Sequence, residues 1–167
     1  THHLANGRSS IEALPSLLAQ LPSLLEQSFI TSSYKDVSLN PLPRILGEHG
    51  YSSAFFHGGY TGTMYFDVLA NLFSFTRYYG AEDFPSQADS LDGQWCIMDE
   101  PFLLFTAKEL SKQKAPFFAT IFTLSSHHPY TIPEHHQGRF PKGKLEIHES
   151  IGYADYALAQ FFAAAEK

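Results

Sequence analysis

Residues 117–124 read Phe-Phe-Ala-Thr-Ile-Phe-Thr-Leu, the strongest strand signal in the chain. A strand with apolar side chains on both faces is typical of the centre of a sheet that helices cover on both sides. The run opens directly into a polar loop, Ser-Ser-His-His-Pro-Tyr, at residues 125–130. This pattern predicts a central strand that delivers His127 and His128 to one edge of a sheet.

A second strand is predicted at residues 51–56, which read Tyr-Ser-Ser-Ala-Phe-Phe and run into His57-Gly58-Gly59. Ligands of open α/β sheets bind outside the carboxyl ends of the strands, so the two histidine-bearing loops are expected at the same edge. The glycines would let a ligand approach the backbone closely. The alternative is that His57 has a purely structural role.

The remaining pattern is helical and completes an α/β domain over residues 1–167. Apolar residues recur at helical spacing, and serine, aspartate and proline stand where helices begin. We predict an open sheet with helices on both faces. Helices are expected at residues 10–25 (broken by prolines), 43–49, 66–75, 99–112 and 150–165, with irregular structure at 78–91 and loop at 131–146.

Composition supports one globular domain and excludes some functions. The chain has 167 residues, 44% hydrophobic and 17% charged, which is enough for a packed core. Its net charge of -6 argues against a general nucleic-acid binder, which needs excess lysine and arginine. The single cysteine, Cys96, allows no intrachain disulfide, and no apolar run approaches the ~20 residues of a membrane helix. Because Thr1 is not a natural start, we expect the chain to be part of a longer protein.

Two serines stand at the start of the first predicted helix. Ser9 and Ser10 would meet the unpaired N–H groups and the positive end of the helix dipole, a setting that favours an oxyanion. The alternative is that one of them only caps the helix.

Other polar residues carry weaker signals. His135 and His136 are expected to be solvated surface, and without a His-x-x-x-His helix or a cysteine pair a self-contained zinc site is not expected. Asp92, Asp99 and Glu100 surround Trp95 in the sequence. They would either form the wall of a pocket or be turn and helix-cap residues, and the second interpretation is favoured. The residues alone therefore indicate an α/β enzyme-like domain with serine and histidine at one sheet edge.

Five segments, in this order, resemble the sulfatase family of the alkaline-phosphatase superfamily. The resemblance is to its lipoteichoic acid synthase and phosphoglycerol transferase group, the membrane-bound bacterial sulfatases. The segments are Ala-Asn-Gly-Arg-Ser-Ser-Ile-Glu-Ala-Leu-Pro (5–15), Phe-Phe-His-Gly-Gly-Tyr-Thr-Gly-Thr-Met-Tyr-Phe-Asp (55–67), Asp-Gly-Gln-Trp-Cys-Ile-Met-Asp-Glu-Pro-Phe (92–102), Phe-Thr-Leu-Ser-Ser-His-His-Pro-Tyr (122–130) and Ile-Gly-Tyr-Ala-Asp-Tyr-Ala-Leu (151–158).

The resemblance implies a set of site residues. We assign the nucleophile to Ser10, with Ser9 kept open, and the same hydroxyl would ligate a divalent metal, expected to be Mn²⁺. The chain has Met64 and Phe66 where the synthases carry a Trp and an Arg that help bind glycerol phosphate, a departure that bears on the substrate. The implied substrate-binding residues are His57, His127, Met64 and Trp95.

The implied activity is phosphoryl transfer from a phospholipid or glycan phosphodiester, by double displacement through the serine. A family member would have an acidic metal ligand upstream and an Asp-His pair downstream of this chain, so the isolated chain is expected to be inactive and to bind metal weakly. The parent protein is expected to be membrane-anchored on the extracytoplasmic face of a bacterial inner membrane.

Two other functions stay open. A sulfatase of sulfate esters would need a Cys/Ser-x-Pro-x-Arg frame, which residues 9–12 lack. In a non-catalytic binding module, the serines would cap a helix and the histidines would pack.

Overall fold

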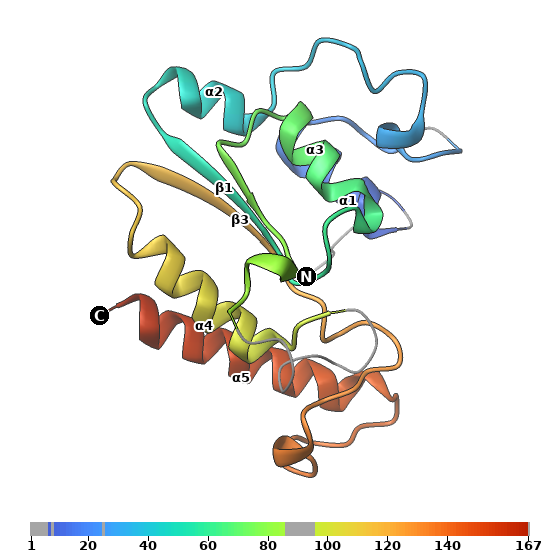
Figure 1. Ribbon diagram of the computed structural model, residues 1–167. Coiled ribbons are helices and arrows are strands. Elements are labelled where there is room, and N and C mark those ends of the chain that lie inside the picture. Colours follow the sequence, from blue (N-terminus) through green and yellow to red (C-terminus); the bar gives the residue numbers. More distant parts are fainter. Residues whose placement is uncertain (1–6, 8, 25, 86–95, 167) are drawn as a thin grey trace. The chain divides into compact units, whose positions relative to one another are not determined.

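The computed structural model describes residues 7, 9–24, 26–85 and 96–166 (Figure 1). The chain divides into two compact units. The first comprises residues 1–54, 62–78 and 115–119, and the second comprises residues 55–61, 79–114 and 120–167.

One small parallel sheet provides the strands, in the order β2-β1-β3. These are β1 (Ser52–His57), β2 (Arg77–Tyr79) and β3 (Phe117–Phe122). The first residues of each strand belong to the first unit and the last residues to the second. The α/β class predicted from the sequence is therefore confirmed.

The prediction that residues 117–124 form the central strand of the sheet was wrong. Among the described strands β1 is the central one and is buried along almost its whole length, whereas β3 pairs on one side and its side chains are half-exposed. An apolar sequence indicates that the side chains of a strand are buried. It does not determine whether the strand pairs with another strand on one side or on both. The sequence also missed β2, which falls partly in the segment expected to be irregular.

The first unit holds three helices around an aromatic and aliphatic core. They are α1 (Ser10–Ala19), α2 (Leu42–Glu48) and α3 (Phe66–Leu72). Helix α1 ends at Ala19, six residues before the predicted end, and its C-cap residue Gln20 takes a left-handed conformation (φ 54°). Its inner face is buried, and Phe29 packs against Phe73 with ring centroids 6.5 Å apart. The buried side chains here include Leu14, Leu18, Ile30, Phe66 and Leu69.

The second unit is built on two helices that run side by side, α4 (Asp99–Leu110) and α5 (Ile147–Ala165) (Figure 1). Phe56 of β1 stacks on Tyr79 of β2 at a centroid distance of 4.4 Å. Helix α5 begins three residues earlier than predicted, and a 3-10 turn, Glu134–His136, interrupts the expected loop.

Within the described ranges, no helix combines the length and the apolar character that crossing a membrane requires.

Candidate functional site

The two candidate nucleophiles lie at the start of α1, in the first unit. Ser9 is the N-cap residue with an extended backbone (φ -130°, ψ 158°), and Ser10 is the first helical residue. The Glu12 carboxylate accepts a hydrogen bond from the Ser9 backbone N–H at 3.0 Å, which fixes the helix start. Both serines are exposed, so their hydroxyls are accessible to a ligand. Their role as nucleophile or metal ligand stays a prediction.

His57 is the last residue of β1 and is completely buried in the second unit. Its ring approaches Phe122 edge-on, with centroids 5.8 Å apart. A side chain at Gly59 would place its Cβ 2.8 Å from Cε1 and 3.0 Å from Nε2 of this imidazole. Gly59 is therefore required by the histidine ring, which fills the space that the sequence suggested for a ligand.

The turn after His57 is held by hydrogen bonds from several segments. The carbonyl of Gly58 accepts from Ile97 N, and the carbonyl of Gly59 accepts from Ala81 N, both at 2.9 Å. Further along the turn, the Glu82 carboxylate accepts from the Thr61 backbone N–H at 3.0 Å and from its hydroxyl at 2.9 Å.

The exposed Glu82 carboxylate has a lowered pKa. Partial burial acts in the opposite direction, but hydrogen bonds from its own backbone and from Thr61 outweigh it, and nearby His57 adds a favourable charge. Glu82 thus clamps the His57 turn in its ionised form.

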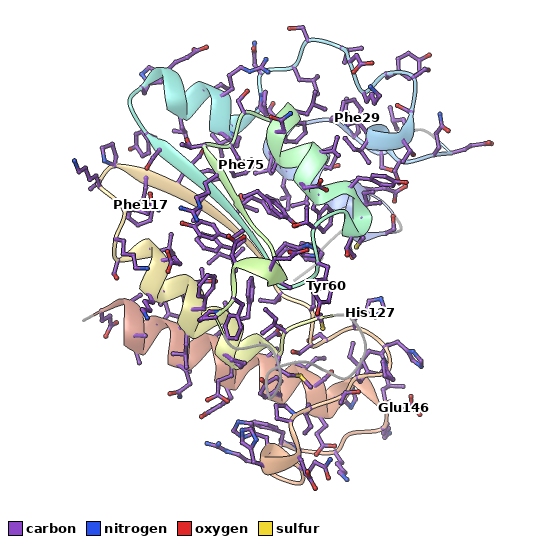
Figure 2. All side chains as sticks on the ribbon, viewed as in Figure 1. Phe29, Tyr60, Phe75, Phe117, His127 and Glu146 are labelled. Atoms are coloured by element: carbon purple, nitrogen blue, oxygen red, sulfur yellow. The ribbon has the colours of Figure 1, made fainter. Side chains whose placement is uncertain are left out.

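His127 lies in a tight turn after β3 and is exposed, as Figure 2 shows for its labelled side chain. Its backbone N–H donates to the carbonyl of Leu124 at 3.0 Å, and its own carbonyl accepts from Tyr130 N at 2.7 Å. The ring Nδ1 lies 2.7 Å from the carbonyl of His128. Because a carbonyl can only accept, Nδ1 carries a proton and donates it to this carbonyl.

Asp99 was expected to cap α4 but does something else. The N-cap is Met98, and Asp99 is the first helical residue, with 1% of its surface exposed. Its Oδ1 accepts from the backbone N–H groups of Leu124 (2.9 Å) and Ser125 (3.0 Å), while its own N–H donates to the Ser125 hydroxyl at 2.9 Å. Burial raises the pKa of Asp99 even though these hydrogen bonds favour the carboxylate. No local signal could have revealed partners 25 residues away.

Glu100 connects α4 to α5 through a second polar network. Its backbone N–H donates to the Tyr153 hydroxyl at 3.1 Å, and its carboxylate accepts from the Tyr156 hydroxyl at 3.0 Å. The other carboxylate oxygen accepts from Nε2 of His136 at 2.8 Å. Burial raises the pKa of the Tyr153 hydroxyl, so it remains protonated. The expectation that His136 is solvated was wrong, because only 4% of it is exposed; His135 is exposed as expected.

Glu100, His135 and His136 are also a group that could hold a divalent metal. Their ligand atoms lie within 4.8 Å of one another. However, Arg139 Nη1 lies 3.2 Å from Nδ1 of His136 and can only donate, so Nε2 carries the ring proton and donates to Glu100. A metal at Nε2 would have to displace that proton with a guanidinium nearby. The observed arrangement is a completed hydrogen-bond network, and binding of an ion would require it to rearrange.

The other two expected substrate-binding residues are Met64 and Trp95. Met64 belongs to the first unit, is half-buried and has a left-handed backbone (φ 55°), as does Tyr65 (φ 57°). Two consecutive non-glycine residues in this region store strain of about 1–3 kcal/mol each, and such strain often occurs at ligand sites. Trp95 lies outside the described residues.

A cavity of about 290 Å³ lies beside α1 in the first unit. The residues of α1 that line it, Glu12 and Pro15, come shortly after the candidate serines in the sequence. Most of its lining is apolar. Its lining comprises Glu12, Pro15, Leu21, Pro22, Ser23, Leu24, Gln27, Phe29, Tyr34 and Val37.

Comparison with solved structures defines the class of this fold as that of the alkaline phosphatase superfamily. A superfamily protein from Vibrio parahaemolyticus superposes with a TM-score of 0.82 at 25% identity, covering 97% of this chain and 40% of its own. A lipoteichoic acid synthase, LtaP from Listeria monocytogenes, superposes with a TM-score of 0.77 at 23% identity, covering 94% of this chain and 40% of its own.

Within that class, the model of the Sulfatase family matches residues 1–167, and the chain belongs to the Sulfatase family. A curated relative, the lipoteichoic acid synthase-like YvgJ of Bacillus subtilis (strain 168), is 32% identical over 148 residues. That match covers 84% of this chain and 23% of the relative, so the chain spans about a quarter of the relative's length. The resemblance seen in the five sequence segments is thereby confirmed, and this is a family of enzymes.

Proposed function

We propose that this chain, residues 1–167, is part of a single sulfatase-like catalytic domain that transfers a phosphoryl group from a phosphodiester, with Ser10 or Ser9 as nucleophile. The observation that carries the proposal is the placement of His57 and His127. The two residues terminate or follow β1 and β3, which are neighbouring parallel strands, in a chain of the Sulfatase family. Carboxyl ends of neighbouring strands are where α/β enzymes gather their functional groups.

The names of the relatives support a phospholipid-derived or glycan phosphodiester as the substrate. Two of the proteins compared above are named as a lipoteichoic acid synthase or synthase-like protein. On these names we place the parent protein at the extracytoplasmic face of a bacterial inner membrane, held there by a membrane anchor.

The reaction would proceed in two displacements. The serine Oγ attacks phosphorus, an Oγ–P bond forms, and the bond from phosphorus to the leaving alcohol breaks. The serine hydroxyl loses its proton as the Oγ–P bond forms, and the leaving oxygen takes up one proton, so the step balances. The exposed His127 would hydrogen-bond the transferring group or the leaving oxygen. An acceptor alcohol or water then attacks phosphorus and releases the serine.

A divalent metal, which we expect to be Mn²⁺, would supply charge neutralisation for the phosphoryl oxygens and a lower pKa for the serine hydroxyl. This chain offers it the hydroxyl of Ser10, which is one ligand. A stable catalytic site needs at least three fixed protein ligands. The others would come from parts of the longer protein outside this chain.

Single Ser9→Ala and Ser10→Ala variants of the full-length protein test the proposal. Activity would be measured on an aryl phosphodiester and on an aryl sulfate with added Mn²⁺. We expect the nucleophile's variant to lose about a thousand-fold or more in kcat on the phosphodiester, since the covalent ester forms on that hydroxyl. Ser111→Ala, an exposed serine at the end of α4 whose hydroxyl bonds Lys108, is the matched control.

Each other result has a definite meaning. Faster turnover of the aryl sulfate would make the protein a sulfatase. Full phosphodiesterase activity in both serine variants would refute the serine mechanism, and no turnover of either substrate by the unmodified protein would favour a binding module.

A further inference from the structure

We propose that Asp99 is a positioning residue for His127, acting through a reciprocal clamp with Ser125. The inference rests on the proposed function, because it gives His127 a role at the phosphoryl group. It assigns a task to a buried carboxylate that lies in a different element from the histidine and does not contact substrate.

The clamp begins with two backbone N–H groups that share one acceptor. Leu124 N and Ser125 N donate to Asp99 Oδ1 at 2.9 and 3.0 Å. Consecutive N–H groups of an extended strand point in opposite directions, so both can reach one oxygen only where the chain turns. Asp99 therefore fixes the direction in which the backbone leaves β3.

The clamp is reciprocal. The Asp99 backbone N–H is in the first turn of α4, where no carbonyl of the helix can accept from it. It donates to the Ser125 hydroxyl at 2.9 Å instead. All the groups involved are almost completely excluded from water: Asp99 is 1% exposed and Ser125 and Leu124 are 4% and 5% exposed. Hydrogen bonds excluded from water are strong, and the Asp99 Oδ1 can accept both N–H groups whether or not the carboxyl is ionised. The helix start and the strand end therefore define each other's position.

The backbone of His127 is joined to this clamp by a hydrogen bond. Its N–H donates to the carbonyl of Leu124, the residue whose N–H is held by Asp99. The His127 side chain is exposed, and its ring Nδ1 donates to the carbonyl of His128 at 2.7 Å, so the ring follows the course of this turn. Asp99 aligns the backbone of the turn through Leu124.

A purely structural role for Asp99 is the competing explanation, because the clamp also satisfies the first turn of α4. The two explanations differ in one measurable respect. If Asp99 acts through His127, its removal should matter much less once the imidazole is gone. A loss of stability alone would lower activity by the same factor with or without His127.

The test is a double-mutant cycle on kcat/KM in the full-length protein with an aryl phosphodiester. Ser125→Ala removes one arm of the clamp and leaves both bonds to Asp99 Oδ1, so it should fold even if Asp99→Ala does not. Asp99→Asn keeps a carbonyl oxygen that can accept both N–H groups and serves as the conservative rescue. The control for stability is Thr106→Val. Thr106 is an equally buried residue of α4, and its hydroxyl donates to the carbonyl of Phe102 in the same helix.

We expect Ser125→Ala to lower kcat/KM by about 10-fold, because small misplacements of a reacting group cost up to about 100-fold. In a His127→Ala background the same change should cost less than about 2-fold. Asp99→Asn should retain more activity than Asp99→Ala, and Thr106→Val should leave kcat/KM unchanged.

Two results would overturn the inference: equal factors for Ser125→Ala with and without His127, or full activity in Ser125→Ala and Asp99→Ala together with a deficient His127→Ala. Full activity in His127→Ala would instead refute the proposed role of His127.

Discussion

The turn that follows His57 and the turn that carries His127 come after neighbouring strands, yet the two are held in opposite ways. His57 is completely buried, and the carboxylate that clamps its turn, Glu82, is exposed. His127 is exposed, and the carboxylate that clamps its turn, Asp99, is buried.

The difference shows that packing can fix a buried side chain, whereas the position of an exposed side chain depends on how its backbone is held. Packing against Phe122 and the face of Gly59 already fixes the His57 ring, so a solvated clamp is sufficient. The His127 imidazole is exposed, and the backbone of its turn is fixed by the buried hydrogen bonds to Asp99. Three predictions test this contrast.

The largest effect is expected from Asp99→Ala. It leaves the N–H groups of Leu124 and Ser125 buried without an acceptor, which should lower the free energy of unfolding by about 2–4 kcal/mol. Urea unfolding of the full-length protein would measure it. Glu82→Ala is the counterpart on the other turn and should cost less than about 1 kcal/mol because water can replace the carboxylate. Similar costs for the two variants would contradict the contrast.

A smaller effect is expected from Gly59→Ala. The added Cβ would meet a buried ring that has no room to retreat, which should cost about 1–3 kcal/mol. Gly47→Ala in α2 is the matched control: its Cβ meets nothing within 4 Å, and replacing a helical glycine should gain about 0.5–1 kcal/mol. Thermal unfolding of both variants would give the comparison, and an unchanged midpoint for Gly59→Ala would show that His57 is not packed as described.

The smallest effects are those of pH, and the two clamps should act with opposite signs. The pKa of Glu82 is lowered from 4.5, so its stabilisation is present above that value and is lost as the pH falls through the lowered pKa. Burial raises the pKa of Asp99 from 3.8, so the folded state favours its protonated form; that contribution to stability is complete below 3.8 and is lost as the pH rises through the raised pKa. The Oδ1 atom accepts the two N–H groups in either form.

Unfolding free energies measured over this acidic range would separate the two carboxylates. Glu82→Gln should flatten the loss of stability on acidification, whereas Asp99→Asn should flatten the loss as the pH rises. A change of the same sign in both variants would contradict the assignment.

Those features of the site that depend on residues close together in the sequence could be predicted from it. His57 was correctly placed at the end of a strand and His127 in the loop after one, because a strand and the loop that follows it are contiguous in the chain. Asp99 was placed correctly at a helix start but misread as a cap, since its partners lie beyond β3. His136 was wrongly predicted to be on the surface, because the polar sequence of its loop does not indicate that it contacts the carboxylate of Glu100 on α4.

By itself, the sequence determined the α/β class, the start of each helix to within a few residues, and membership of the Sulfatase family. These follow from side-chain periodicity and from motifs, which are local properties. The tertiary structure decided that β1 lies between its neighbours, that His57 is buried, and that Asp99 holds the turn before His127. Each of these depends on hydrogen bonds or packing between segments distant along the chain, and which distant segments meet is settled only when the whole chain competes for the same buried space.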